Sequence, residues 1–340
     1  MNLRKNLALA GALWGLVLLA CERPKQEDVG RTVPAASASL PADKAPTPSG
    51  SAAEPKPNSL AQLEDGVKLL SAGAEPRKPL RYSFVKGHKH KLVLTQKNQV
   101  KVKIGEEQMP GTDVPPITTT IQWEVTDASQ AFAQIAFKVL SASVEGSKND
   151  PLVMQVNEML ADFKAFHGRQ RSDSRGSLLG FEMDQSAIAN PQVAQMLEAI
   201  KQSVGQLISP LPDEAVGVGG MWQVVSHFDQ FGVKLLQRAT YSVVQLDEKG
   251  VLTDIELEQT APPGKVAPPG MPAGMTVELV SLASKGQGRT HIDFKNCVST
   301  SDIAINLSMK MRIPEGPSVP PGGQLLEMEM VTSMKIAQAK

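Results

Sequence analysis

Three side chains of catalytic types, His291, Asp293 and Cys297, lie close together in the sequence. Their odd numbering places them on one face of an extended segment. At a rise of ~3.3 Å per residue, His291 and Cys297 lie ~20 Å apart, far outside hydrogen-bond reach. We therefore expect no cysteine–histidine pair here.

A second catalytic pattern, Ser83-x-x-Lys86, matches the acylation motif S-x-x-K of penicillin-binding proteins. That motif acts at the start of a helix together with K-T-G, whereas here it lies in a strand-like segment and K-T-G is absent. G-x-S-x-G, H-E-x-x-H, C-x-x-C and a phosphate-binding glycine loop are absent as well. The sequence predicts a protein that is not an enzyme and uses no cofactor.

His88 and His90 have the spacing of two metal ligands, ~6.6 Å apart in an extended chain. A protein metal site needs three or four ligands, and no third stands beside them in the sequence. We expect exposed histidines in a turn and no metal site.

Five methionines form the strongest candidate binding surface. Methionine is flexible and polarisable, so it suits surfaces that accept varied apolar partners. With the long helix described below, the strands could enclose an apolar cavity of ~300 Å³ or more for an acyl chain or similar lipid-like ligand. The alternative is simple packing of the methionines against that helix. They occupy the apolar faces of the last two predicted strands: Met309, Met311, Met328, Met330 and Met334.

The charges of the chain balance, with 35 basic and 35 acidic residues, which argues against a general nucleic-acid binder. Residues 77–103 are locally basic, and most of their lysines have odd numbers, opposite the apolar face of a predicted hairpin. We interpret this as a solvated face. The alternative is contact with lipid headgroups or anionic envelope polymers.

The N-terminal segment has the layout of a secretory signal. Arg4 and Lys5 precede an uncharged run over residues 7–20, which is too short for a comfortable membrane span. Leu18-Leu19-Ala20-Cys21 then resembles the lipobox of bacterial lipoproteins, although Leu19 is bulkier than usual there. The resemblance implies that residues 1–20 are a signal peptide and that Cys21 is acylated, becomes the first mature residue and anchors the protein to a membrane. Cys297 would then have no disulfide partner.

Two further segments separate the anchor from the folded part. Residues 21–58 contain the anchor and a stretch rich in Pro, Ala and Ser, which predicts an extended, disordered tether. Residues 59–76 predict a short helix or connector, because Ser59 and Gln62 fit a capping box and Gly73 and Pro76 end the helical spacing.

Residues 77–340 change to a period of two, which predicts antiparallel strands with one buried face. The first would be a hairpin around residues 87–89, with Tyr82 opposite Leu94. Asp150-Pro151 starts a brief helix, and residues 193–208 form an apolar stripe of helical spacing. The predicted fold class is mainly β (α+β): one curved antiparallel sheet or half-barrel of about ten strands, packed on one long amphipathic helix.

The order of lipobox, tether, "LRYSF", helix, "GVGGMW" and hairpins resembles uncharacterised lipoproteins of Gram-negative bacteria. The predicted topology resembles the half-barrel of the Lol lipoprotein carriers, in which a bent sheet surrounds an apolar cavity, although aromatics are only 4% of this chain. The resemblance implies a lipid-anchored binding or carrier protein of the cell envelope, at the outer membrane. The alternative is a structural or protein-interaction component of the envelope with a fully packed core.

The lipobox gives a direct test of the anchor. Wild-type protein should incorporate labelled fatty acid, and Cys21→Ala should abolish the label and leave the chain unprocessed or free of the membrane, because stable attachment needs more than one acyl chain. Absence of label in the wild type would show that Cys21 is not a lipidation site.

Overall fold

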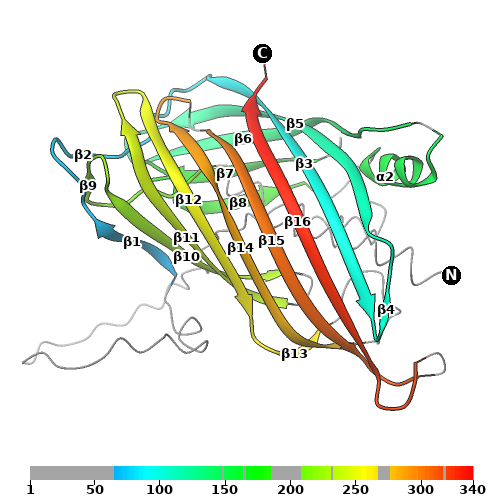
Figure 1. Ribbon diagram of the computed structural model, residues 1–340. Helices are drawn as coiled ribbons and strands as arrows, with labels where there is room; N and C mark the ends of the chain where they lie inside the picture. Colours follow the sequence, from blue (N-terminus) through cyan, green and yellow to red (C-terminus); the bar gives the residue numbers. More distant parts are fainter. Residues whose placement is uncertain are drawn as a thin grey trace, which may run out of the picture.

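The computed structural model describes residues 65–147, 149–161, 163, 166–184, 208–230, 233–266, 276–296, 298–316 and 319–339 (Figure 1). Cys21, the tether and Cys297 lie outside these ranges, as does all of the helix expected over residues 193–208 except Ile208.

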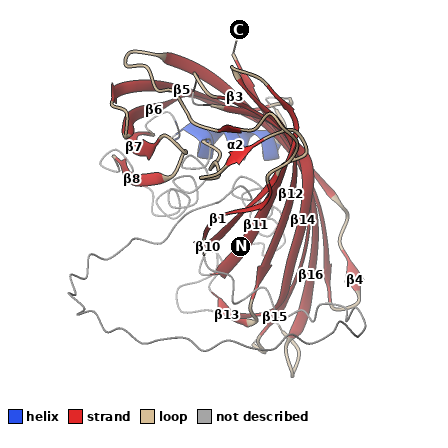
Figure 2. Cartoon of the chain, turned by 90° about the vertical axis from the view of Figure 1, so that its left-hand side faces the viewer, coloured by secondary structure: helices blue, strands red, loops and turns tan. Residues whose placement is uncertain are grey.

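One antiparallel 14-stranded sheet makes up most of the described chain. Figure 2 shows that it is bent, so that β7 and β8 at one edge turn back toward β1 and β10 at the other. In spatial order its main path is β1 (Gly66–Ser71), β10 (Met221–Gln230), β11 (Val233–Leu246), β12 (Gly250–Ala261), β14 (Val277–Asp293), β15 (Ser299–Ile313), β16 (Gln324–Gln338), β3 (Lys89–Ile104), β5 (Thr112–Ala128), β6 (Phe132–Val144), β7 (His167–Asp173) and β8 (Leu178–Met183).

Three short additions complete the strands. β13 (Gly264–Val266) pairs with β14, β4 (Glu107–Gln108) pairs with β3, and β2 (Lys78–Pro79) forms a separate two-stranded sheet with β9 (Ala215–Val216).

Strict alternation of burial explains why β15 and β16 form long strands. In β15 every second residue from Ile303 to Ile313 is buried and the residues between them are exposed. In β16 buried residues alternate in the same way from Leu326 to Ile336. Successive side chains of a strand point to opposite faces, so each strand has one apolar face turned to the core. We call this side of the sheet the buried face.

The one helix in the described ranges is α2 (Pro151–Ala161), which Figure 2 shows on the inner side of the curved sheet. Its buried residues Val153, Val156 and Leu160 are three or four positions apart, so they share one helix face. The Asn157 side chain accepts a hydrogen bond from the backbone N–H of Val144 in β6, at 3.3 Å. The brief helix predicted after Asp150 is confirmed. No helix in the described part of the chain combines the length and hydrophobicity that a membrane span needs.

The predicted fold class is wrong in its helical part. The described chain is nearly all β, and it has more strands than the ten that were expected. Its helix α2 has only 11 residues, and its main contact with the sheet is with β6. The error has a physical cause: a stripe of helical spacing shows that one side of a segment is apolar, but it does not show what that side packs against.

The hairpin expected around residues 87–89 does not form. β3 starts at Lys89 and runs unbroken to Ile104, whereas the residues before it lie in a loop. In that loop, backbone N–H groups of Tyr82 and Ser83 donate to the carbonyls of Ser174 and Phe294, both at 2.7 Å. These contacts with distant loops replace the local strand pairing.

The helix expected over residues 59–76 is also wrong where it is described. Gly66–Ser71 is strand β1, paired with β10 from Gly66 opposite Val225 onward. A helix this short is marginal by itself, whereas the edge of β10 offers backbone hydrogen-bond partners. The folded part therefore includes residues ahead of 77.

Gly73, which follows β1, gives a sharp test of this corner. Its φ is +76°, and a Cβ there would lie 2.6 Å from the Gly217 carbonyl oxygen and 2.7 Å from that of Val218. Gly219 has the same φ with open space around it. Gly219→Ala should therefore cost only the left-handed backbone penalty of about 1–2 kcal/mol. Gly73→Ala should lower the free energy of unfolding by clearly more, because backbone must move. Equal losses in urea titrations of the two variants would contradict the packing of β1.

Candidate functional site

The structure brings the five predicted methionines together on the buried face of β15 and β16. Their side chains are between 1% and 8% exposed. Met309 lies directly opposite Met328, and the others alternate with Leu and Ile partners across the two strands. We call Met309, Met311, Met328, Met330 and Met334 the methionine patch.

No described helix makes a substantial contact with the strands of the patch. α2 contacts β6, and the other substantial contacts of the sheet strands are with their neighbours. Three pockets of ≈650, ≈460 and ≈20 Å³ are lined by other residues. The patch is therefore a buried apolar surface, and the 300 Å³ cavity expected at it is not among these three pockets.

A polar group that sequence reasoning missed lies beside the patch. Gln96, Asn98 and Thr332 are at most 2% exposed. Gln96 Nε2 donates to Asn98 Oδ1 at 3.0 Å, and Thr332 Oγ1 donates to the same oxygen at 2.9 Å. In the register of β16 and β3, Gln96 faces Met334. The signal was present in the sequence, because Gln96 and Asn98 interrupt an otherwise apolar set of even positions in residues 92–104.

Among the residues that the structure describes, none donates a hydrogen bond to the side-chain carbonyl oxygen of Gln96, Oε1. Gln170 on β7 repeats the arrangement: it is 1% exposed, its Nε2 donates to Ser172 Oγ at 3.2 Å, and its Oε1 has no partner. A buried polar atom without a partner costs ~1–3 kcal/mol and calls for an explanation such as water, strain or a ligand.

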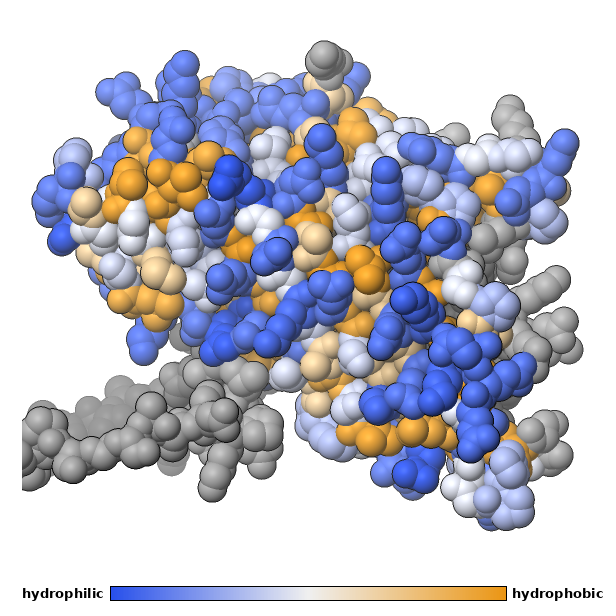
Figure 3. Space-filling view, viewed as in Figure 1, coloured by the Kyte–Doolittle hydropathy of each residue, from blue (hydrophilic) through white to orange (hydrophobic). Residues whose placement is uncertain are grey.

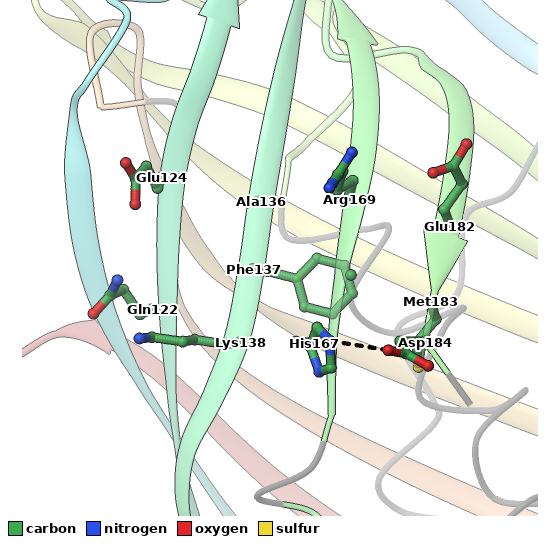
Figure 4. A pocket seen from close by; sticks show the side chains of 11 residues that line it. Gln122, Glu124, Ala136, Phe137, Lys138, His167, Arg169, Glu182, Met183 and Asp184 are labelled. Atoms are coloured by element: carbon green, nitrogen blue, oxygen red, sulfur yellow. Dashed lines mark ion pairs between the residues drawn. The ribbon is translucent and has the colours of Figure 1, made fainter. Parts of the chain in front are cut away.

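The largest of the three pockets, ≈650 Å³, lies on the exposed side of β5 to β8 (Figure 4). Ala136 forms part of its wall between Glu124 and Arg169, and His167 forms an ion pair with Asp184 at 3.3 Å. Charges of both signs are thus exposed to solvent there, where such pairs contribute little energy.

The other catalytic candidates do not assemble into a site. Ser83 and Lys86 lie in the loop before β3, not at a helix start, and Lys86 pairs with Asp127 at 3.4 Å. His291 and Asp293 are in β14, and Cys297 is outside the described residues. In the ranges that the structure covers, no three His, Cys, Asp or Glu side chains are grouped closely enough to hold a metal ion.

The basic segment over residues 77–103 does not form a hairpin: the residues just before Lys89 lie in a loop, and those from Lys89 onward belong to β3. Lys89, Lys91, Lys97, Lys101 and Lys103 lie on the exposed side of β3. Lys89 pairs with Glu124 at 3.1 Å and Lys103 with Glu327 at 3.8 Å. Hydrogen bonding and charge from Lys310 lower the pKa of Glu327. Figure 3 shows many hydrophilic side chains on this side of the molecule, with apolar ones between them. The exposed lysines of β3 fit the predicted solvated face.

Comparisons with known proteins add little to this picture. No protein-family model matches the chain. No curated protein matches it. Solved structures that are similar to it have low TM-scores, as three of them show. One is Ail, the attachment invasion locus protein of Yersinia pestis, with a TM-score of 0.16 and 8% identity over 74% of this chain and 100% of that chain. Another is an outer membrane channel from Pseudomonas putida F1, with a TM-score of 0.19 and 7% identity over 75% of this chain and 97% of that chain. A third is a loop-deletion mutant of OmpT, an outer membrane protein of Vibrio cholerae, with a TM-score of 0.19 and 7% identity over 73% of this chain and 99% of that chain.

His90 gives a pH test of the end of the sheet where β3 begins. Burial lowers the pKa of His90, nearby His88 lowers it further, and Asp293 opposes both. The folded protein therefore takes up this proton less readily than the unfolded chain, whose histidine pKa is about 6.5. Above that pH, His90 is neutral in both states and does not reduce the free energy of unfolding. Below it, the unfolded chain binds the proton more readily than the folded protein, so the free energy of unfolding decreases as the pH falls.

Urea unfolding at pH values on both sides of about 6.5 measures this effect. His90→Gln should flatten the loss of stability on acidification, and His88→Gln should reduce it partly, because burial of His90 remains. A pH dependence unchanged by His90→Gln would contradict this assignment.

Proposed function

We propose that the protein is a lipid-anchored lipoprotein of the cell envelope that binds a lipid-like ligand on the buried face of its sheet. The lipobox at Cys21 and the tether over residues 22–58 support the anchor. The proposal places the anchored protein at the outer membrane. In this proposal its partners are the membrane and the ligand, it does not bind nucleic acid, and it catalyses no reaction.

The methionine patch is the observation that carries the ligand. Flexible side chains with three rotatable bonds can rearrange around an acyl chain, whereas branched side chains cannot do so as easily. Five of them lie on the buried face of two adjacent strands. Met309, Met311, Met328 and Met330 belong to one hydrophobic cluster, and Met334 lies beyond Thr332 on the same face. No described helix packs substantially on β15 or β16.

A second candidate is a structural or protein-interaction component of the envelope with a packed core. Its support is the low exposure of the same five methionines, four of which are at most 3% exposed. In that case the methionines are gap-filling core residues and bind nothing.

Met311→Ala separates the two candidates. A packed core should lose ~2–5 kcal/mol of unfolding free energy, because the substitution leaves a cavity. A ligand-site wall should lose less, and the affinity for a fluorescent lipid probe should change. We expect the second result in urea titrations and probe titrations of the full chain.

Ile135→Ala is the matched control, because Ile135 is 2% exposed on β6, away from the patch. It should lose ~2–5 kcal/mol and leave probe affinity unchanged. If the wild type binds no probe and Met311→Ala is as destabilising as Ile135→Ala, the packed envelope component is the correct function.

A further inference from the structure

In the described part of the chain, the buried face contains polar side chains but no charged ones. Among the described residues, every buried polar side chain is Gln, Asn, Ser or Thr. A charged head group brought against these described residues would meet no opposite charge among them, and burying an unpaired charge is far more costly than burying a neutral polar group. A ligand of this face should therefore have an uncharged head group.

Gln96 is the buried polar side chain that lies next to Met334 of the methionine patch. Its Nε2 is already engaged by Asn98, which also accepts a hydrogen bond from Thr332. Its Oε1 is an acceptor to which no described residue donates, in a side chain that is 1% exposed. Because Gln96 faces Met334 across β3 and β16, this oxygen lies at the border of the methionine patch.

We infer that the methionine patch binds the chain of a single-chain amphiphile with an uncharged, hydrogen-bond-donating head group such as a hydroxyl, and that this group donates to Gln96 Oε1. The inference rests on the proposed function and specifies its ligand class. A carboxylate offers only acceptors, so it would face the Gln96 carbonyl without a hydrogen bond. An alkane or an ether has no donor, so it would leave Oε1 unsatisfied.

Displacement of the fluorescent probe N-phenyl-1-naphthylamine from the full chain tests the inference. The competitors are dodecan-1-ol, its methyl ether and dodecanoate, which share one alkyl chain and differ in the head group. Dodecan-1-ol should displace the probe at about tenfold lower concentration than the ether, equivalent to about 1.4 kcal/mol for the hydrogen bond. Dodecanoate should be no better than the ether.

Gln96→Leu should bring alcohol and ether to the same displacement concentration, because the acceptor is gone while the apolar surface remains. Gln170→Leu is the matched control: Gln170 has the same burial and the same unpartnered oxygen, but it lies on β7 with β3, β5 and β6 between it and β16. That variant should keep the preference for the alcohol. Gln96→Met provides a second replacement of similar length if Gln96→Leu fails to fold.

The outcomes distinguish this inference from the proposed function. If wild-type protein does not bind the probe, the proposed function fails. If it binds the probe but alcohol and ether displace the probe equally, the Gln96 assignment fails and the proposed function stands. The same holds if Gln96→Leu and Gln96→Met keep the preference for the alcohol. In either case a bound water is left as the partner of Oε1.

Discussion

The antiparallel pairing of β16 with β3 is the contact on which the rest of the structure depends. Along the sheet, β16 ends the row that begins with β1 and β10, and β3 begins the row that ends with β7 and β8. Without the pairing of β16 with β3, these two rows would be separate sheets. The hydrogen bond from Thr332 to Asn98 crosses this seam between residues 234 positions apart. Contacts of such separation carry a large loop-closure cost, so they form only because a long run of backbone pairs forms with them.

The same pairing composes the candidate site. β16 supplies three methionines of the patch, and β3 supplies the Gln96 amide next to them. An apolar surface therefore borders a fully buried polar one. Amide and hydroxyl groups can be buried at moderate cost when they bond to one another, as Asn98 and Thr332 do, whereas a charged group could not. The low polarity of this face thus disfavours charge both on its own side chains and on any ligand that binds there.

The opposite side of the sheet obeys a different constraint. Its lysines and carboxylates face solvent, and several meet across neighbouring strands, as Lys89 and Glu124 do. Exposed pairs of this kind add little stability. They keep an extensive sheet surface hydrophilic and discourage association of the face with other chains.

A period of two in the sequence was sufficient to predict β15 and β16, the face that each presents, and the gathering of five methionines. These two strands follow one another in the chain and pair with each other. α2 was also predictable, from an aspartate followed by proline and an apolar stripe. The sequence of residues 92–104 even showed Gln96 and Asn98 on the apolar side, although their significance was missed.

Only the tertiary structure decided which strands became neighbours. Alternation identifies the face of a strand but not its partner, since backbone hydrogen bonds are the same for every pair. The seam between β3 and β16, the capture of β1 by the edge of β10, and the loop over residues 80–86 all come from contacts distant in sequence. The sequence by itself therefore determined which face of β15 and of β16 would be buried. The tertiary structure determined that an unpaired glutamine oxygen would lie beside methionines more than 200 positions away, because long-range pairing sets the register.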